Sequence, residues 1–335
     1  MRRIAALVAA SVLVLTTAAC GGSAKPTTGG GSAGPGSTKV TLTLNWVPYG
    51  EHAPFYYGLK KGIYAAEGID LTIKAGTGSG TTIQQVDQKN TTYGWADTPV
   101  LLNSVAKGMK VKSLGVFLQK GPSSIESLAD KNINSPADLK GKKIGGTPGD
   151  ALYATFPAWL KANGLATTDV TIVNVDAAGK IAALSEGRVD AIMGFFHDQG
   201  PTIEAKTGKK VKYLLYADYG MNMLGTGIVA NTEALAQNPD LARKFVRATQ
   251  KAWQEAAKDI PGAVDAMAEL AENEPAKEVL TKQLTLCLPL TQLDKGTPGV
   301  NDESKWSETV DLMTKYGNLK DPGSPSKYWD NTYAK

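Results

Sequence analysis

The stretch LNWVPYGEHAPFYYGLKKGIYAAE, residues 44–67, decides both the fold and the site that we expect. An apolar run at residues 40–44 leads into it with the period of two that is typical of a half-buried strand. The strand breaks at Pro48, and apolar side chains four residues apart then predict a helix over residues 53–67. A strand followed by a helix indicates an α/β protein.

The loop between this strand and this helix is rich in side chains that can recognise a small molecule. In an open α/β sheet, ligands are bound at the loops beyond the carboxyl ends of the strands. We therefore predict that the loop forms one wall of a small-molecule pocket. Its candidate ligand-binding residues are Trp46, Tyr49, Glu51, His52 and Tyr56.

The bulk composition is that of a globular protein large enough to form two lobes. The chain has 335 residues, of which 42% are hydrophobic and 20% are charged. The formal net charge of +4 includes Arg2 and Arg3, and the remaining bases alternate with acids instead of clustering. This pattern argues against a nucleic-acid-binding protein.

We interpret residues 1–20 as a signal peptide. Arg2 and Arg3 precede an apolar stretch at residues 4–15 that is too short to span a bilayer as a mature helix. Small residues then lead to Cys20, an arrangement that resembles the lipobox of bacterial lipoproteins, in which this cysteine is lipidated. Thr17 stands where that motif usually has leucine. A plain secretory signal that is cleaved nearby is the alternative.

Residues 21–38 predict a flexible tether, because they are nearly all Gly, Ser, Thr, Ala and Pro and cannot bury apolar surface. Cys20 and Cys287 are the only cysteines, so a lipidated Cys20 leaves no disulfide within the chain. Cys287 should then be a small buried hydrophobic residue. We expect a lipid-anchored protein at the outer face of the cytoplasmic membrane, in an extracellular or periplasmic position.

Two further loops in the first half place polar groups at helix starts. The glycine-rich loop at residues 76–82 opens a helix whose free N–H groups favour anions or polar acceptors by about 0.3–1 kcal/mol. It is not a nucleotide P-loop, because Thr81 stands where such a loop has lysine. Asp97 and Thr98 end the next strand, and either can simply cap the helix that begins near Pro99. The candidate ligand-binding residues in these loops are Gly78, Ser79, Gly80, Thr81, Asp97 and Thr98.

The second half repeats this order of elements. A strand and a loop at residues 146–150 open a helix, and a later helix stops at Gly187 before another strand. The segments at residues 119–124 and 218–226 have the character of crossovers between two similarly built lobes that face one another across a cleft. The candidate ligand-binding residues of the second wall and the hinge are Ser123, Ser124, Asp150, Tyr153, Phe195, Phe196 and Asn222.

We therefore predict an α/β protein of two lobes, each a mixed sheet flanked by helices, joined by a hinge of two crossovers. The first lobe should comprise residues 39–118 and 225–335, and the second lobe should comprise residues 119–224. The chain beyond residue 231 is mostly helical, and its apolar spacings indicate packing rather than a site.

This layout resembles the substrate-binding proteins of ABC importers, which have the type II periplasmic-binding-protein fold. Within that group the sequence is similar to the family of thiamine-precursor, sulfonate and nitrate binding proteins. The similarity covers residues 41–231 well and the C-terminal helices in outline. Its motifs are LNW with Pro48 and His52, GIY at 62–64, EGIDL at 67–71, Gly94 with Asp97, SPADLKGKKIG at 135–145, and Gly187 with VDA at 189–191.

The resemblance implies a monomer that captures a small solute in its cleft, closes over it and presents it to a membrane permease with its ATPase. The W-x-P-x-x-x-H spacing is similar to that of members that bind pyrimidine precursors of thiamine. This similarity would place Trp46 and His52 against the ligand. His52 could instead cap the helix at Ala53. A non-transport signalling or adhesion lipoprotein that keeps the fold is a remote alternative.

The charge of the ligand is left partly open by the sequence. No arginine lies in a predicted cleft loop, although sulfonates and phosphates are often held by arginine. This absence favours a neutral or weakly charged nitrogen heterocycle. A sulfonate, taurine or nitrate type of ligand is the alternative, because helix starts can hold an anion without arginine.

Catalysis is not expected. A related fungal pyrimidine synthase uses pyridoxal phosphate on a lysine, and an ungapped comparison through Gly94 and Gly108 places that lysine at Ala96 and its essential histidine at Val100. The loop at residues 220–225 also lacks the cysteines of that enzyme. With two histidines and no C-x-x-C, H-E-x-x-H or G-x-S-x-G pattern, we predict no catalytic residues, no cofactor and no metal site.

Overall fold

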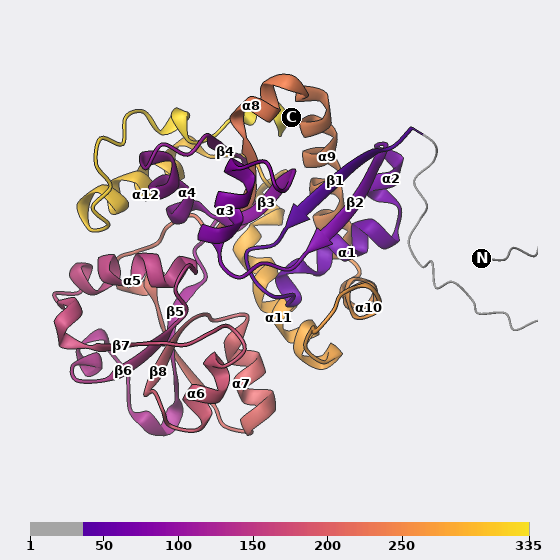
Figure 1. Cartoon of the computed structure of the whole chain (residues 1–335). Coiled ribbons are helices and arrows are strands. Elements are labelled where there is room, and N and C mark those ends of the chain that lie inside the picture. The colour runs from indigo at the N-terminus through magenta and orange to yellow at the C-terminus, as the bar shows by residue number, and fades with distance from the viewer. Residues whose placement is uncertain (1–35, 335) are drawn as a thin grey trace, which may run out of the picture.

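The computed structural model describes residues 36–334. The predicted signal peptide, Cys20 and most of the predicted tether lie outside these residues. The described chain forms two lobes, each built on a five-stranded mixed sheet flanked by helices (Figure 1). This arrangement confirms the predicted fold class.

The first sheet has the strand order β2-β1-β3-β10-β4. Strand β1 is parallel to β2 and β3, whereas β10 returns from far along the chain and lies antiparallel between β3 and β4. Strand β1 begins at Thr38, so the last residue of the predicted tether (residues 21–38) belongs to this strand. The strands are β1 (Thr38–Thr43), β2 (Ile69–Lys74), β3 (Tyr93–Asp97), β4 (Val111–Val116) and β10 (Thr226–Asn231).

The helix predicted over residues 53–67 is interrupted. It breaks at Gly62, whose φ of +70° is a left-handed conformation that glycine adopts without strain. A short 3₁₀ turn, η1, also precedes it and turns the loop after β1 inward. These elements and the next two helices are η1 (Gly50–His52), α1 (Ala53–Lys60), α2 (Ile63–Ala66), α3 (Ser79–Asp87) and α4 (Thr98–Ala106).

The second sheet repeats the pattern with the order β7-β6-β8-β5-β9. Here β5 is the antiparallel strand between β8 and β9. Residues 123 and 124, predicted as part of a crossover, belong to this strand. The strands are β5 (Ser123–Leu128), β6 (Lys143–Gly146), β7 (Thr171–Asn174), β8 (Ala191–Phe195) and β9 (Val211–Leu215), and the helices are α5 (Ala151–Ala162), α6 (Lys180–Ser185) and α7 (Gln199–Thr207).

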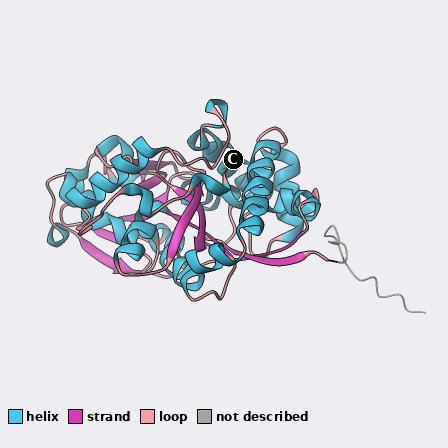
Figure 2. Cartoon of the chain, turned by 90° about the horizontal axis from the view of Figure 1, so that it is seen from above, coloured by secondary structure: helices cyan, strands magenta, loops and turns pink. Residues whose placement is uncertain are grey.

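The C-terminal part is helical and packs mainly on the first lobe. The apolar face of α9 lies against α1, and α11 contacts both η1 of the first lobe and α7 of the second (Figure 1). Seen from above, helices lie on the outside of the strands (Figure 2). Cys287 on α11 is fully buried in the core of the first lobe, as predicted. The helices are α8 (Thr232–Gln237), α9 (Pro239–Ala256), α10 (Ile260–Leu270), α11 (Lys277–Thr291) and α12 (Glu303–Lys315).

The two lobes touch where their helix-start loops meet. The backbone N–H of Gly80 donates to the carbonyl of Gly149 over 3.1 Å. Gly78 has a φ of +143°, and a Cβ atom built there would lie 2.4 Å from the carbonyl oxygen of Gly149. Only glycine therefore permits this approach of the two loops.

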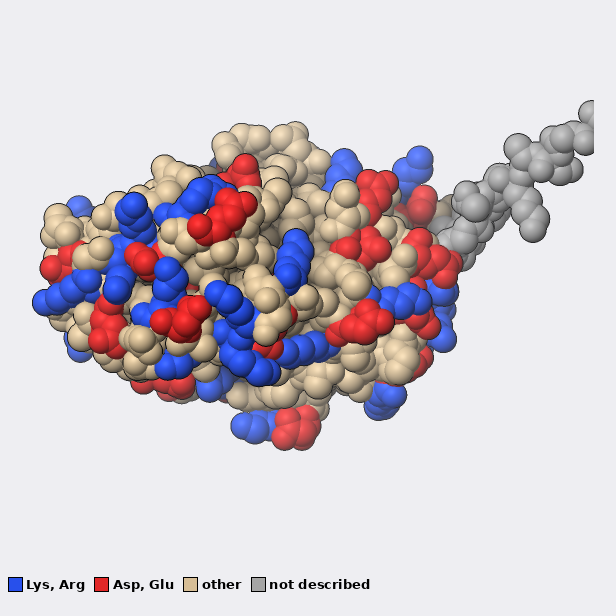
Figure 3. All heavy atoms as spheres, turned by 90° about the horizontal axis from the view of Figure 1, so that it is seen from below, with Lys and Arg blue, Asp and Glu red and all other residues tan. Residues whose placement is uncertain are grey.

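The described surface carries charges of both signs. Basic and acidic side chains are interspersed over the face shown in Figure 3, which is consistent with the balanced composition. Among residues 36–334, no helix combines the length and the hydropathy that crossing a bilayer requires.

Candidate ligand-binding site

A pocket lies between the two lobes, at the strand ends of both sheets. The first lobe contributes Asn45, Trp46, Tyr49, Ser79 and Asp97, and the second lobe contributes Asp150, Ala151, Leu152, Lys180, Phe195, Asp198 and Gln199.

Trp46 and Lys180 face one another across this cavity. The loop after β1 carries Trp46, and the first residue of α6 is Lys180, whose side chain is only 2% exposed. Its Nζ lies 4.7 Å from the centre of the indole ring, within the range of a cation–π contact. The same Nζ donates to Asp150 Oδ2 over 3.0 Å and to the carbonyl of Met193 over 3.1 Å. The positive group of the cavity is thus already paired with a carboxylate.

Asp97, at the end of β3, is a buried carboxyl in the first-lobe wall. The hydroxyl of Ser79 donates to its Oδ2 over 2.8 Å, and its own N–H donates to that hydroxyl oxygen over 3.1 Å. Burial raises the pKa of Asp97 to about 7, and the nearby charges of Glu51 and Asp150 act in the same direction. Asp97 therefore changes its protonation state near neutral pH.

Asp198, just before α7, is the corresponding carboxyl in the second-lobe wall. Burial raises its pKa to about 8, against the opposing effect of Lys180. Gln283 of α11 donates to Asp198 Oδ1 over 3.1 Å, and Gln199 donates to Oδ2. The cavity thus contains two carboxyls that titrate near neutrality, because the wall around them excludes water.

Glu51 is fully buried and bonds Tyr49 of the cavity wall. Its Oε1 accepts from Trp95 Nε1 over 2.6 Å and from the Thr226 hydroxyl over 2.7 Å. Its Oε2 accepts from the Tyr49 hydroxyl over 2.7 Å and from His197 Nε2 over 2.8 Å. Burial alone would raise the pKa of Glu51, but the hydrogen bonds and the neighbouring histidines outweigh it and lower the pKa to about 2.

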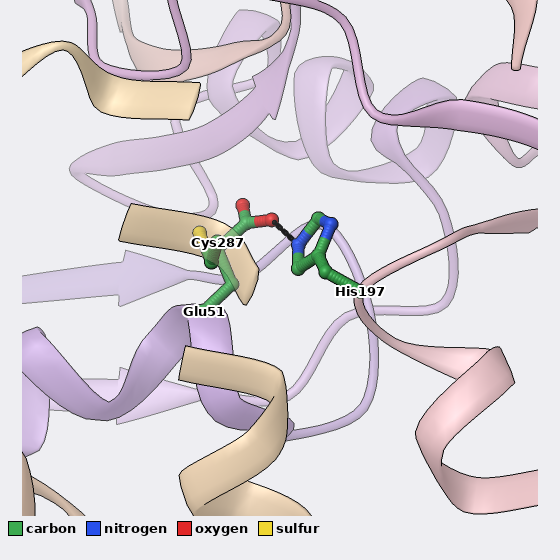
Figure 4. A group of neighbouring side chains, drawn as sticks. All are labelled: Glu51, His197 and Cys287. Atoms are coloured by element: carbon green, nitrogen blue, oxygen red, sulfur yellow. Dashed lines mark hydrogen bonds and ion pairs between the residues drawn. The ribbon is translucent and has the colours of Figure 1, made fainter. Parts of the chain in front are cut away.

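Glu51, His197 and Cys287 meet in one group (Figure 4). They bring potential metal-ligating atoms within 4.8 Å of one another, but each carboxylate oxygen already accepts two hydrogen bonds. Burial also raises the pKa of the Cys287 thiol well above its usual range, whereas a metal binds the thiolate. The group therefore fits a hydrogen-bonded contact between the lobes better than a metal centre.

The structure brings six of the predicted residues together around the cavity, although they come from five separate segments of the chain. These residues are Trp46, Tyr49, Ser79, Asp97, Asp150 and Phe195.

His52 is not among them, because its side chain does not line this pocket. Its ring is fully buried, with Nε2 at 2.8 Å from Asn45 Oδ1, and it makes no side-chain cap of α1. The physical reason is η1, which turns both Glu51 and His52 toward the interior. Burial lowers the pKa of His52 to about 4, so the ring is neutral at pH 7.

Other predicted residues serve the framework around the cavity. The Thr98 hydroxyl donates to the carbonyl of Gly225 over 2.7 Å, and Ser124 is bonded within its own sheet to the carbonyl of Gly194. The Tyr153 hydroxyl donates to Asn174. Phe196 packs beside the first-lobe core. None of these four side chains lines the cavity, and their ligand contacts stay predictions.

The remaining predicted residues lie outside the cavity. Tyr56 and Asn222 line separate surface hollows, and Thr81 donates to the carbonyl of Gly78 over 2.7 Å. Gly78 and Gly80 form the contact with Gly149 described above, so they close the cavity rather than line it. Ser123 lines a second, adjoining cavity.

Sequence reasoning missed Asn45, Lys180, Asp198 and Gln199. Asp198 and Gln199 lie three and four residues after Phe195, the predicted site residue that ends β8, so a wider choice of residues at that strand end would have included them. Lys180 follows Gly179 at a helix start, and a lysine there is normally exposed. Its burial and its bonds to Asp150 and Met193 appear only in the folded second lobe.

The fold and the interlobe cavity define a two-lobed solute-binding protein. The alkanesulfonate-binding protein SsuA of Xanthomonas axonopodis pv. citri, solved bound to MOPS, has the same fold, with a TM-score of 0.69 at 15% identity. The match covers 89% of this chain and 99% of that one. The periplasmic-binding-protein fold predicted from the sequence is confirmed.

The sequence profile of the family described as NMT1/THI5 like matches residues 50–261, and the chain belongs to this family. The riboflavin-binding protein RibY of Chloroflexus aurantiacus is 27% identical over 313 residues, or 90% of this chain and 88% of that protein. The formylaminopyrimidine-binding protein of Halalkalibacterium halodurans is 22% identical over 289 residues, or 84% and 87% of the two chains. Both relatives are named as binding proteins.

Proposed function

We propose that this protein is the extracytoplasmic solute-binding component of an ABC importer, and that its solute is a small nitrogen heterocycle of the pyrimidine type. The heterocycle occupies the interlobe cavity, the lobes close over it, and the closed form delivers it to a membrane permease. A lipid on Cys20 would hold the protein at the outer face of the cytoplasmic membrane, with residues 21–37 as the tether.

The charge of the cavity wall is the observation that carries this choice of ligand. Asp97, Asp150 and Asp198 all line the cavity, and Lys180, the only basic residue in the described lining, is paired with Asp150. A sulfonate or nitrate would face carboxyls without a free positive group to offset them. A ring that carries amino or ring N–H donors would instead find acceptors on several sides.

The apolar part of the wall supports the same class. Trp46 from the first lobe and Phe195 from the second offer aromatic surface to a flat ring, which is worth about 0.5–1.5 kcal/mol beyond area burial. The names of the two relatives agree, because riboflavin contains a pyrimidine ring within its fused ring system and formylaminopyrimidine is built on one.

The alternative of an anionic ligand depends on the start of α3, which was expected to offer free N–H groups. In the structure the N–H of Gly80 already donates to Gly149, and the hydroxyl of Ser79 is committed to Asp97. The likeness to the alkanesulfonate-binding protein concerns the fold, and the cavity wall argues against a sulfonate here.

Isothermal titration calorimetry on the purified full-length protein tests the proposal. The panel consists of an aminopyrimidine, riboflavin, taurine and nitrate, added after carried-over solute has been removed by unfolding and refolding. We expect micromolar or tighter binding of at least one heterocycle and none of the two anions. Binding of taurine or nitrate without any heterocycle would reject the proposed ligand class. Native mass spectrometry before refolding would identify the solute that the protein carries.

A further inference from the structure

Two carboxyls, Asp97 and Asp198, line the interlobe cavity from opposite lobes. Asp97 ends β3 of the first lobe, and Asp198 directly precedes α7 of the second lobe. Both residues are buried, with 3% and 8% of their surface exposed. Closure of the lobes therefore places two potential negative charges against the same solute.

Neither carboxyl has a positive partner among residues 36–334. Asp97 accepts a hydrogen bond from the Ser79 hydroxyl over 2.8 Å. Asp198 accepts from the side-chain amides of Gln199 and Gln283, the second over 3.1 Å. All of these donors are neutral, so the two carboxyls are hydrogen-bonded but not charge-compensated.

The one basic group of the described lining does not fill this role. Lys180 donates to Asp150 over 3.0 Å, and these two charges offset one another. Three aspartates and one lysine line the cavity, so their net charge is −2 when all of them are ionised. The missing positive charge has to come from outside the described chain or from bound protons.

The aromatic part of the wall is an independent sign of a cation. Trp46, Tyr49 and Phe195 all line the cavity. The Nζ atom of Lys180 lies 4.7 Å from the centre of the Trp46 ring, so this indole already accepts a cation over its face. Aromatic faces are also the groups with which proteins recognise organic ammonium ligands.

We propose that the solute is a cation whose positive charge lies between Asp97 and Asp198. The charge supplies the ion-pair partner that both carboxyls lack, and it attracts the two lobes that carry them toward one another. This inference rests on the proposed function and narrows its ligand class to positively charged nitrogen heterocycles.

Without such a solute, the closed cavity has to hold protons, because an unpaired buried charge is strongly unfavourable. Burial accordingly raises the pKa of Asp97 to about 7 and that of Asp198 to about 8. The charged or titratable groups around them are Glu51 and Asp150 for Asp97, and Lys180, Glu51, Tyr49 and Glu126 for Asp198. A bound cation stabilises both carboxylates, so their protons are released to the solvent.

Two probes of the same shape test the charge on the full-length protein at pH 7, after carried-over solute has been removed. 4-Aminopyridine is a cation at this pH, whereas aniline, which has a ring carbon in place of the ring nitrogen, is neutral. We expect calorimetry to show about tenfold tighter binding of 4-aminopyridine. Titrations in buffers of different ionisation enthalpy should also show that its binding releases protons.

The variants Asp97→Asn and Asp198→Asn separate charge from shape, because the amide keeps the size of the carboxyl. Each should remove most of the preference for 4-aminopyridine over aniline and reduce the number of protons released. A merely structural role of either carboxyl would instead weaken both probes alike. Asp70→Asn, at an exposed position on β2, is the control and should change neither quantity.

The aminopyrimidine and riboflavin of the calorimetric panel keep this test separate from that of the proposed function. Equal wild-type affinities for 4-aminopyridine and aniline, or an unaltered preference in both asparagine variants, would overturn the cationic solute. If a heterocycle of the panel binds in that case, the proposed function stands. If neither the panel heterocycles nor 4-aminopyridine bind, the proposed function fails and the inference fails with it.

Discussion

His197 of the second lobe donates a hydrogen bond from Nε2 to Glu51 of the first lobe over 2.8 Å, and both side chains are fully buried. The same carboxylate oxygen accepts from Tyr49, which lines the ligand cavity. One carboxylate therefore connects the ligand-facing loop with the contact between the lobes. The bond can form only when the lobes are together.

Replacing His197 with alanine should destabilise the closed arrangement. The variant leaves the buried charge of Glu51 with one donor fewer, at a cost of about 3 kcal/mol in the free energy of unfolding. Small-angle scattering should also show a larger radius of gyration than for the wild type. His52→Ala is the control, because His52 bonds Asn45 within the first lobe. It should lower stability without changing the radius, and an equal expansion in both variants would contradict the interlobe role.

Asp97 and Asp198 should make the protein less stable as the pH rises. Their pKa values in the folded chain are about 7 and about 8, against a usual value of 3.8, so the folded state holds more protons than the unfolded state between these limits. The free energy of unfolding then falls with rising pH, by up to about 1.4 kcal/mol per pH unit for each group. Urea titrations between pH 5 and 8 measure this slope.

The variants Asp97→Asn and Asp198→Asn should each flatten that slope, because the amide does not titrate. Asp70→Asn, at an exposed position on β2, is the control and should leave the slope as it is.

Glu51 has the opposite effect on stability in acid. Its folded pKa of about 2 lies below the usual 4.5, so its contribution is present above pH 4.5 and is lost as the pH falls toward 2.

Trp46→Ala should weaken binding of the heterocycle by about tenfold or more, because it removes the aromatic surface of the first-lobe wall. Trp46→Phe keeps part of that surface and should lose less. Calorimetry with the tightest-binding member of the panel gives both affinities. Unchanged affinity in Trp46→Ala would remove this side chain from the site.

Lys180→Met should destabilise the protein by about 3 kcal/mol, since Asp150 would keep a buried charge without its partner. Adding Asp150→Asn to the same chain should restore most of the loss, because both charges are then gone. Chemical unfolding of the two single variants and the double variant measures this coupling. Additive losses would show that the pair makes no net contribution.

Much of the fold was predictable because the local sequence patterns favour the same strands and helices that the tertiary structure contains. The alternation of β1, the glycines and prolines at strand ends and the repeated order of elements indicate two similar lobes. The strand β5 was missed, since its sequence SSIESL has no clear alternation and reads as a polar connection. The break of the first helix at Gly62 was missed because a single glycine is compatible with a helix.

The site was predictable where it follows directly from strand ends, as at Trp46, Asp97, Asp150 and Phe195. It was not predictable where tertiary structure decides the direction of a side chain. The sequence cannot show that η1 turns His52 inward, or that Lys180 is buried against Asp150.

The approach of Gly78 to Gly149 has a consequence for any receptor of this design. A methyl group on Gly78 would meet the carbonyl of Gly149 and hold the two lobes apart, so solute would still enter and leave but the lobes would not close fully. A permease that recognises loaded receptors by their closed shape would then treat every such molecule as empty. The fidelity of import would thus depend on the absence of a side chain at Gly78.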